Sequence, residues 1–398
     1  MAEGIQKLIT YKKEVDWGVK PTNTGGQLLR RVTGSFQLEK EVYQSEEINS
    51  SQQVKDMRHG TRRATGSLSG EISGTAYADF IAAALRKDFA TGVTTGAIAT
   101  IAADEDTGTS KYIRSAGSFV TDGFKVGDVV VVSGFTTAAN NGLFVVVGVT
   151  ATELTIEHFS ETGALVDEVE GDTVTIAVKG KKTLVPQSNH TNDSFTVEEW
   201  HSDDSISRIS LGQQVDSMSI NVAPNSMATI EFGFLGKNAE PSTGSRYFAA
   251  PTAQPSEGIY SGPDGLLIIN GVANRKVTSL SLSVANGITQ EAVIGSNSIG
   301  AKSRGKVNVT GSLSAIFDSN TILNYFDNET EVSVTYALRS ADGTDAFAVT
   351  MPRVKLGSGT NDDGEKVIIL SADFTALERT DGSTVNDAST IAIQDTTL

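Results

Sequence analysis

The sequence has no cysteine and only four histidines and eight prolines in 398 residues. Disulfide scaffolds, thiolate catalysis and zinc ribbons are therefore excluded, and the scarcity of histidine argues against a multi-histidine metal site. No apolar run reaches the roughly 18 residues of a membrane-spanning helix. Residues 1–16 do not resemble a signal peptide, so we expect a soluble protein made in the cytoplasm.

Basic residues are also in short supply. The chain has 32 Lys and Arg against 48 Asp and Glu, a formal net charge of -16. A surface of that sign repels nucleic acid rather than binding it. The 39 glycines, together with abundant serine, threonine and valine, favour β-structure over helix.

The sequence contains an internal duplication. The segment Thr-Gly-Ser-Leu-Ser occurs at residues 65–69 and again at 310–314, and an ungapped match at an offset of 245 gives eleven identities over residues 30–69. Each copy reads as strand, long connection, strand and short helix. The later strands match at an offset of 138, so the first copy should contain 107 additional residues.

These offsets predict the domain organisation. We expect a first β-unit of residues 1–94 and 181–245, an inserted β-domain of residues 95–180, a linker of residues 246–261, and a second β-unit of residues 262–398. The inserted segment has frequent turn signals and twelve acidic against four basic residues, which suits a small domain facing water.

Alternating side chains predict sheets with one apolar and one polar face. Phe36 and Leu38 alternate with Gln37 and Glu39, and in the second copy leucines alternate with the serines at 279, 281 and 283. The connections 42–64 and 287–306 are long for hairpins, so we expect them to dock on a neighbouring surface. Nucleic-acid contact by the arginines of the first connection is an alternative, although the second copy does not repeat the charge.

Catalytic constellations are sparse in the sequence. It has no Walker A loop, nucleophile elbow, H-E-x-x-H helix or dinucleotide-binding glycine motif. The acidic segment at residues 104–108 lacks the later bidentate glutamate of a calcium loop and reads as a solvated turn. We therefore expect no enzyme activity, no metal and no cofactor.

Five segments together resemble a known family: Glu14–Gly18, Leu28–Thr33, Arg62–Glu71, the amphipathic stretch Ala76–Lys87, and Phe119–Asp128 within the insert. They look like segments of the tail tube (major tail) proteins of long-tailed bacteriophages, in a double-domain form with an inserted decoration domain. The resemblance covers both copies and the insert.

The resemblance implies a mainly β fold with two homologous tail-tube β-sandwich or barrel domains, each with a flanking short helix, plus the small inserted β-domain. Three chains would form a ring of six tube domains, and stacked rings would form the hollow tube that delivers DNA to the host. The implied partners are copies of the same chain, a tape-measure protein inside the tube, tail terminator and distal tail proteins at its ends, and DNA in passage, without membrane insertion. The protein would be made in the host cytoplasm and end up in the virion tail.

Two sets of residues follow as candidate sites. The long hairpins should contact a neighbouring ring or subunit, and their candidate residues are Glu46, Glu47, Ile48, Val54, Met57, Arg58, Arg62, Arg63, Glu291, Val293, Ile299 and Arg304. The polar sheet face should line the channel, through Gln37, Glu39, Glu41, Ser69, Glu71, Ser279, Ser281, Ser283, Ser312 and Ser314. Alternatively, this face points outward beneath a helix.

Other functions remain open from the sequence. A cell-surface adhesin or a carbohydrate-binding β-sandwich protein would fit the composition, although neither a secretion signal nor a cluster of aromatic residues supports it. A β-rich hydrolase would need a nucleophile and base, and the sequence offers no such pair.

Overall fold

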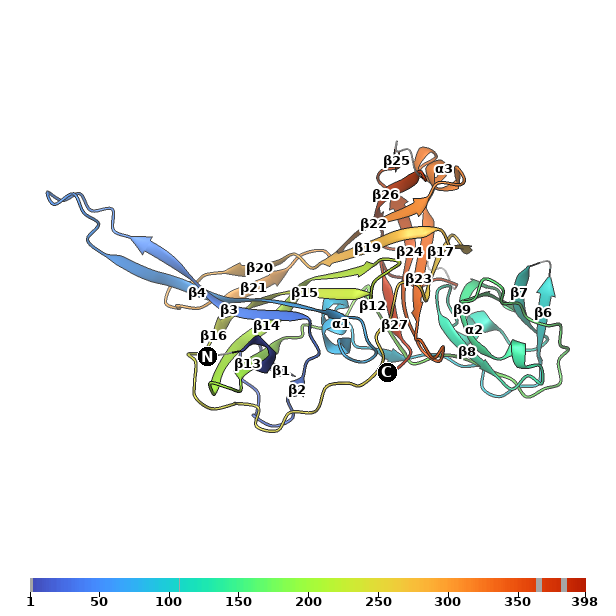
Figure 1. Ribbon diagram of the computed structural model, residues 1–398, viewed down its shortest axis with the longest axis horizontal. Helices are drawn as coiled ribbons and strands as arrows, with labels where there is room; N and C mark the ends of the chain where they lie inside the picture. Colours follow the sequence, from blue (N-terminus) through green and yellow to red (C-terminus); the bar gives the residue numbers. More distant parts are fainter. Residues whose placement is uncertain (1–2, 107, 363–366, 381–384) are drawn as a thin grey trace.

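The computed structural model describes residues 3–106, 108–362, 367–380 and 385–398. It is mainly β, with 49% of residues in strands and 6% in helices, which confirms the predicted fold class. The molecule is elongated, with a two-stranded arm at one end and a separate small sheet at the other (Figure 1).

Seven antiparallel strands form one continuous layer, which we call the main sheet. Their order is β3 (Thr33–Gln44), β4 (Met57–Glu71), β15 (Thr229–Gly236), β14 (Ile206–Val222), β19 (Val277–Ala285), β22 (Asn308–Ile316) and β26 (Ile369–Ala376). Apolar side chains such as Phe36, Leu68 and Phe232 point to one face and are buried. The polar side chains between them point to the other face.

Shorter strands form a second layer over the apolar face of the main sheet. One group is β2 (Gln27–Leu28), β1 (Lys7–Lys13), β13 (Phe195–His201), the first half of β14, and β16 (Asn238–Ala239). The other is β18 (Val272–Asn274), β17 (Gly265–Ile269), β23 (Val332–Arg339), β24 (Ala346–Leu356), β27 (Ala392–Asp395), β12 (Lys181–Leu184) and β5 (Ala90–Thr91). Strands β14 and β24 take part in both layers, and β25 (Thr360–Asn361) pairs with β26.

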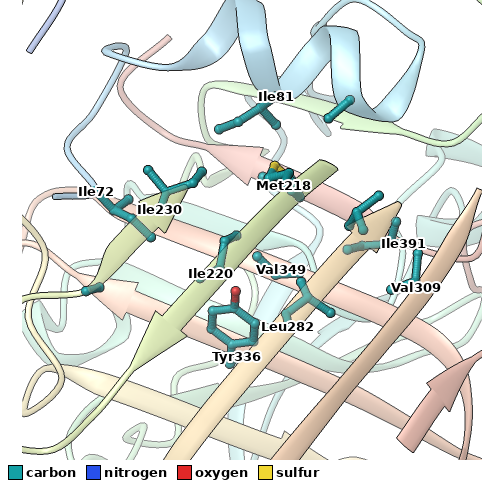
Figure 2. Close-up of a cluster of buried hydrophobic side chains, with 14 of the residues drawn as sticks. Ile72, Ile81, Met218, Ile220, Ile230, Leu282, Val309, Tyr336, Val349 and Ile391 are labelled. Atoms are coloured by element: carbon teal, nitrogen blue, oxygen red, sulfur yellow. The ribbon is translucent and has the colours of Figure 1, made fainter. Parts of the chain in front are cut away.

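One hydrophobic core fills the space between these layers. It includes Ile81 and Met218 from the part of the chain before residue 245, and Leu282 and Ile391 from the part after it (Figure 2). We call strands β1–β5 and β12–β16 the first unit, and strands β17–β27 the second unit. Because both units contribute side chains to one core, the two units pack directly against each other within the single chain.

Two helices pack on the apolar side of the layers. In α1 (Ala78–Leu85), Phe80 is fully buried, with ring centroids 5.0 Å from Phe195 and 5.6 Å from Phe232. The corresponding helix of the second unit is α3 (Thr321–Asp327). A short 3₁₀ turn, η1 (Gly4–Gln6), precedes β1.

The inserted segment has its own six-stranded sheet. The order is β11 (Thr175–Val178), β8 (Val129–Ser133), β9 (Gly142–Val149), β10 (Glu153–His158), β7 (Thr109–Arg114) and β6 (Ile101–Asp106). Helix α2 (Phe119–Asp122) and the 3₁₀ turn η2 (Ala138–Asn140) complete it. Its core includes the fully buried Tyr112, Phe119 and Phe124. We call these six strands, together with α2 and η2, the insert.

Strand pairing corrects the sequence match between the two units. Thr33 faces Ser69 in the first unit, whereas Ser279 faces Ser314 in the second. Since Ser69 and Ser314 are 245 residues apart, Thr33 corresponds to Ser279 at an offset of 246, and the ungapped match is wrong by one residue here. A bulge in β19 after Val277 inserts the extra residue.

The later strands need a second correction. Glu231 faces Ser69 and Ser371 faces Ser314, so β15 corresponds to β26 at an offset of 140 rather than 138. A two-residue shift leaves the same side chains on the same face, which is why the hydrophobic pattern did not reveal it.

Candidate assembly surfaces and channel face

The polar face of the main sheet brings together the residues predicted to line the channel. Gln37 and Glu39 lie on β3, Ser69 and Glu71 on β4, and the serines at 279, 281, 283, 312 and 314 on β19 and β22, all within one paired register. Glu41 lies at a bulge in β3. Because α1 packs on the opposite, apolar face, it does not cover these residues.

This polar face is rich in hydroxyl groups and poor in positive charge. The hydroxyls of Ser281 and Ser312 lie 2.9 Å apart, and those of Ser314 and Ser371 lie 3.1 Å apart. Arg63 and Lys355 are the basic side chains that the described paired strands place on this face. Both are paired, because Arg63 Nε donates to Glu39 at 2.9 Å and Lys355 Nζ donates to Glu329 at 2.6 Å. The face therefore offers no unpaired cation to a phosphate backbone.

Sequence reasoning missed much of this face. Ser217, Ser219 and Asn221 on β14 lie in the middle of it, and Glu231 on β15 and Asp373 on β26 add negative charge. Their alternation with Met218 and Ile220 was a usable signal. The pairing of β14 with β19, which places them at the centre, is a contact between distant segments that alternation alone does not specify.

The two units join edge to edge through this β14–β19 pairing. Six residue pairs connect them, from Ser217 opposite Ala285 to Val222 opposite Leu280. In the described part of the chain, β3 pairs only with β4, and β25 pairs only with β26. The main sheet thus ends on each side in a strand without a further strand partner, with the first unit at one end and the second unit at the other. On β3, the Gly34 carbonyl accepts from Lys7 Nζ at 2.8 Å and the Phe36 N–H donates to Glu199 at 3.2 Å.

The hairpin of the second unit lies on the first unit. It is formed by β20 (Ile288–Glu291) and β21 (Ala301–Arg304). Gln290 donates to the Gly236 carbonyl at 3.0 Å, Arg304 donates to the Thr191 carbonyl at 3.1 Å, and the Asn297 carbonyl accepts from the Arg62 N–H at 3.0 Å. Of the predicted residues, Ile299 is buried, while Glu291 and Val293 are exposed.

The hairpin of the first unit, unlike that of the second, does not lie on the rest of the chain that the structure describes. The ends of β3 and β4 extend away from the body as the arm, residues 42–60 (Figure 1). Ile48, Val54 and Met57 are more than half exposed on it. Its charges pair locally, Lys55 with Glu47 at 3.8 Å and Arg58 with Asp56 at 3.3 Å, and Glu46 is exposed. The arm therefore presents apolar side chains that the chain itself leaves uncovered.

The insert interrupts the first copy in sequence but packs on the second unit. Val129 and Val145 of the insert form an apolar cluster with Leu266, Ile268 and Ala337. The contact is also polar, because Arg275 donates to the carbonyls of His158 and Phe159 at 2.8 and 3.0 Å. The continuous apolar run 266–269 is typical of a strand buried on both faces, and this signal was overlooked.

The described residues contain no group of three or more His, Asp and Glu arranged to hold a metal ion. Ser110 Oγ lies 2.9 Å from His158 Nε2. Glu105 bonds to the serine at 2.5 Å rather than to the other imidazole nitrogen, so the arrangement lacks the group that orients a catalytic histidine. The helices in the described part of the chain are too short or too polar to span a membrane.

A family model described as phage tail tube protein matches residues 4–376. The chain belongs to the phage tail tube protein family. No curated protein matches it. A tail tube protein is a structural component of the virion tail and assembles with copies of itself into a tube. The free sheet edges and the uncovered arm of this tail tube protein are accordingly its candidate assembly surfaces.

Proposed function

We propose that three copies of this tail tube protein close a ring of six tube units, and that stacked rings form a tube through which DNA reaches the host. The supporting observation is the β14–β19 pairing, which joins two homologous units edge to edge. The free edges β3 and β25 occupy the positions that correspond to β19 and β14. Repeating the same junction between chains gives a head-to-tail contact, and such contacts form a ring when their rotation closes.

The junction within the chain also predicts the register between chains. Ser283 and Gln37 correspond, because they face the equivalent Thr310 and Thr65. Ser219 and Thr360 correspond, because they face Glu231 and Ser371, which occupy equivalent positions. Since Ser219 faces Ser283 within the chain, Thr360 should face Gln37 of the next protomer.

A cysteine pair tests this register on a protein that has no cysteine of its own. Opposed residues of an antiparallel pair have Cα atoms roughly 4.5–5.5 Å apart, within the range that a disulfide spans. Oxidised tubes of the Gln37→Cys/Thr360→Cys variant should yield covalent species of up to three chains on denaturing gels. The matched control, Leu38→Cys/Thr360→Cys, places one thiol on the opposite face and should remain monomeric. Cross-linking into long ladders would contradict the closed ring of three.

In the proposed ring, the polar face of the main sheet lines the channel. Carboxylates repel phosphate and hydroxyl groups carry no charge that attracts it, so DNA would slide past without being held. We propose no catalytic activity and no cofactor. A tape-measure protein would occupy the channel during assembly, tail terminator and distal tail proteins would bind the tube ends, and synthesis would take place in the host cytoplasm.

We propose that the chain divides into tube domains at residues 1–94 with 181–245 and at 262–398, an inserted domain at 95–180, and a linker at 246–261. The hairpins would then contact the next subunit or ring, and the inserted domain would project outward. Electron microscopy of purified tubes should show three projections per ring. Six projections per ring would contradict the pairing of two tube domains in each chain.

A further inference from the structure

Arg86 connects the two units at their junction. Its guanidinium donates to the side-chain oxygen and the carbonyl of Asn286 at 2.9 and 3.0 Å, and to the Gly305 carbonyl at 3.1 Å. Arg86 belongs to the first unit, whereas Asn286 and Gly305 belong to the second. The Arg86 side chain is almost fully buried, so these bonds form within the contact between the units.

Arg86 has a clear counterpart in the second unit. It ends α1 in the left-handed conformation, with φ of 61°, and the next residue donates its N–H to the Ala82 carbonyl at 3.1 Å. Glu329 follows α3 with φ of 51°, and the next residue donates its N–H to the Tyr325 carbonyl at 2.8 Å. Each of these bonds spans five residues and closes the same helix-ending turn, so Arg86 and Glu329 occupy equivalent positions.

Asn286 likewise has a counterpart in the first unit. It follows Ala285, the last paired residue of β19, which faces Asn308. The equivalent pair in the first unit is Glu39 opposite Arg63, and the residue after Glu39 is Lys40. Lys40 is exposed on the free edge strand β3.

Glu329 is exposed in the single chain, which leaves its side chain accessible to another protomer. Its side chain is 77% exposed and pairs only at the surface, with Lys355 at 2.6 Å. Asp327, Asn328 and Thr330 beside it are also exposed. At the end of α1, by contrast, Ala84, Leu85 and Arg86 are buried.

We propose that Glu329 of one protomer pairs with Lys40 of the next, in place of the Arg86–Asn286 contact within a chain. The helix end then carries a negative instead of a positive charge, and this difference distinguishes junctions between chains from junctions within a chain. The inference rests on the proposed ring. A β3 edge wrongly placed against β14 would bring Lys40 to Arg86, where two cations repel each other. Such a built-in penalty selects the correct partner edge.

Charge reversal tests the pairing. Tubes are reconstituted from purified full-length protein and followed by sedimentation and electron microscopy. Glu329→Lys should raise the protein concentration needed for tube formation at least about tenfold, because a close like-charge pair at an interface costs several kcal/mol. Lys40→Glu should have the same effect. The double variant, Lys40→Glu/Glu329→Lys, should restore assembly.

Glu331→Lys is the matched control. Its counterpart in the first unit, at the same two-residue spacing from Arg86, is Asp88, which pairs with Lys13 of the same unit at 3.4 Å. Glu331 itself pairs with Arg353 of the same chain at 2.7 Å, so Glu331→Lys removes an ion pair within the chain and none across the junction. We therefore expect this variant to assemble as the unmodified protein does. Circular dichroism of each variant checks that the monomer is folded.

The outcomes separate this inference from the proposed function. Unmodified protein that forms tubes, together with a Glu329→Lys variant that forms them equally well, would overturn the pairing and leave the ring standing. A double variant no better than the single variants would also overturn it. Unmodified protein that never forms tubes would overturn the proposed function and this inference together.

Discussion

Lys182 Nζ lies 2.5 Å from a carboxylate oxygen of Asp128. The same ammonium lies 3.1 Å from Asp387, and both carboxylates are nearly inaccessible to solvent. Asp128 belongs to the insert, Lys182 to the returning chain of the first unit, and Asp387 to the second unit. One buried ion cluster therefore connects the three parts of the chain.

Replacing Lys182 with methionine should destabilise the protein strongly. Burial opposes the charge on this lysine, but the two carboxylates outweigh it and raise the pKa of Lys182, whereas burial raises the pKa of Asp128. Removing the cation leaves two buried carboxylates without a counter-ion, which costs about 3–5 kcal/mol of unfolding free energy. Urea denaturation measures the loss. Lys181→Met, on the neighbouring position of β12, should change stability by no more than about 0.5 kcal/mol, and an equal loss in both variants would contradict the role of the cluster.

The contact of the second hairpin with the first unit should depend on pH through Lys302. Its Nζ lies 4.7 Å from the ring centroid of Trp17, and burial, together with nearby Arg304 and Lys237, lowers the pKa of Lys302 from 10.5 to about 8. At a pH between about 8 and 10.5, Lys302 is mostly protonated in the unfolded chain and mostly deprotonated in the folded chain, so the unfolded chain binds more protons. Stability from this site therefore increases as the pH rises from about 8 to 10.5.

The measurement compares the unfolding free energy of the unmodified protein with that of Lys302→Gln from pH 7 to 10. As the pH rises, the unfolding free energy of the unmodified protein should increase relative to that of Lys302→Gln. Lys306→Gln, an exposed lysine four residues further along, serves as the control. Parallel pH profiles for the unmodified protein and Lys302→Gln would show that Lys302 is not desolvated by the hairpin contact.

A positive charge placed on the polar face should slow DNA passage. Ser283→Lys puts an exposed ammonium near the centre of the main sheet, and every ring of the tube would repeat it. Phage carrying this variant should release DNA at least about tenfold more slowly at low salt and recover at high salt, because bound phosphate is displaced by added ions. Ser283→Asp should release DNA at the normal rate. Salt-independent release by Ser283→Lys would place this face outside the channel.

Local patterns in the sequence were sufficient for several features. The alternation around Phe36 and around Ser281 predicted which side chains share a face, because side-chain direction in a strand repeats every two residues. The repeated segment at 65–69 and 310–314 indicated two homologous units. Turn signals between residues 95 and 180 identified an additional β-segment.

Features that depend on contacts between distant segments were not predicted. The bulge after Val277 changed the correspondence of β3 and β19 by one residue, and an ungapped comparison cannot represent it. The packing of the insert on the second unit depends on side chains more than 100 residues apart, such as Val129 and Leu266. Composition gave the insert an acidic surface but did not indicate where it docks.

The sequence by itself determined the β-rich class, the duplication and the polar face, because each is encoded by spacing along the chain. Only the tertiary structure decided which edges meet, since backbone hydrogen bonding can join any two strands and side-chain packing selects among them. It showed β14 joined to β19, Arg86 buried at that junction, and Glu329 exposed at the equivalent position. The difference between a buried and a free edge is a property of the folded chain, and it is this difference that points to how copies of the protein assemble.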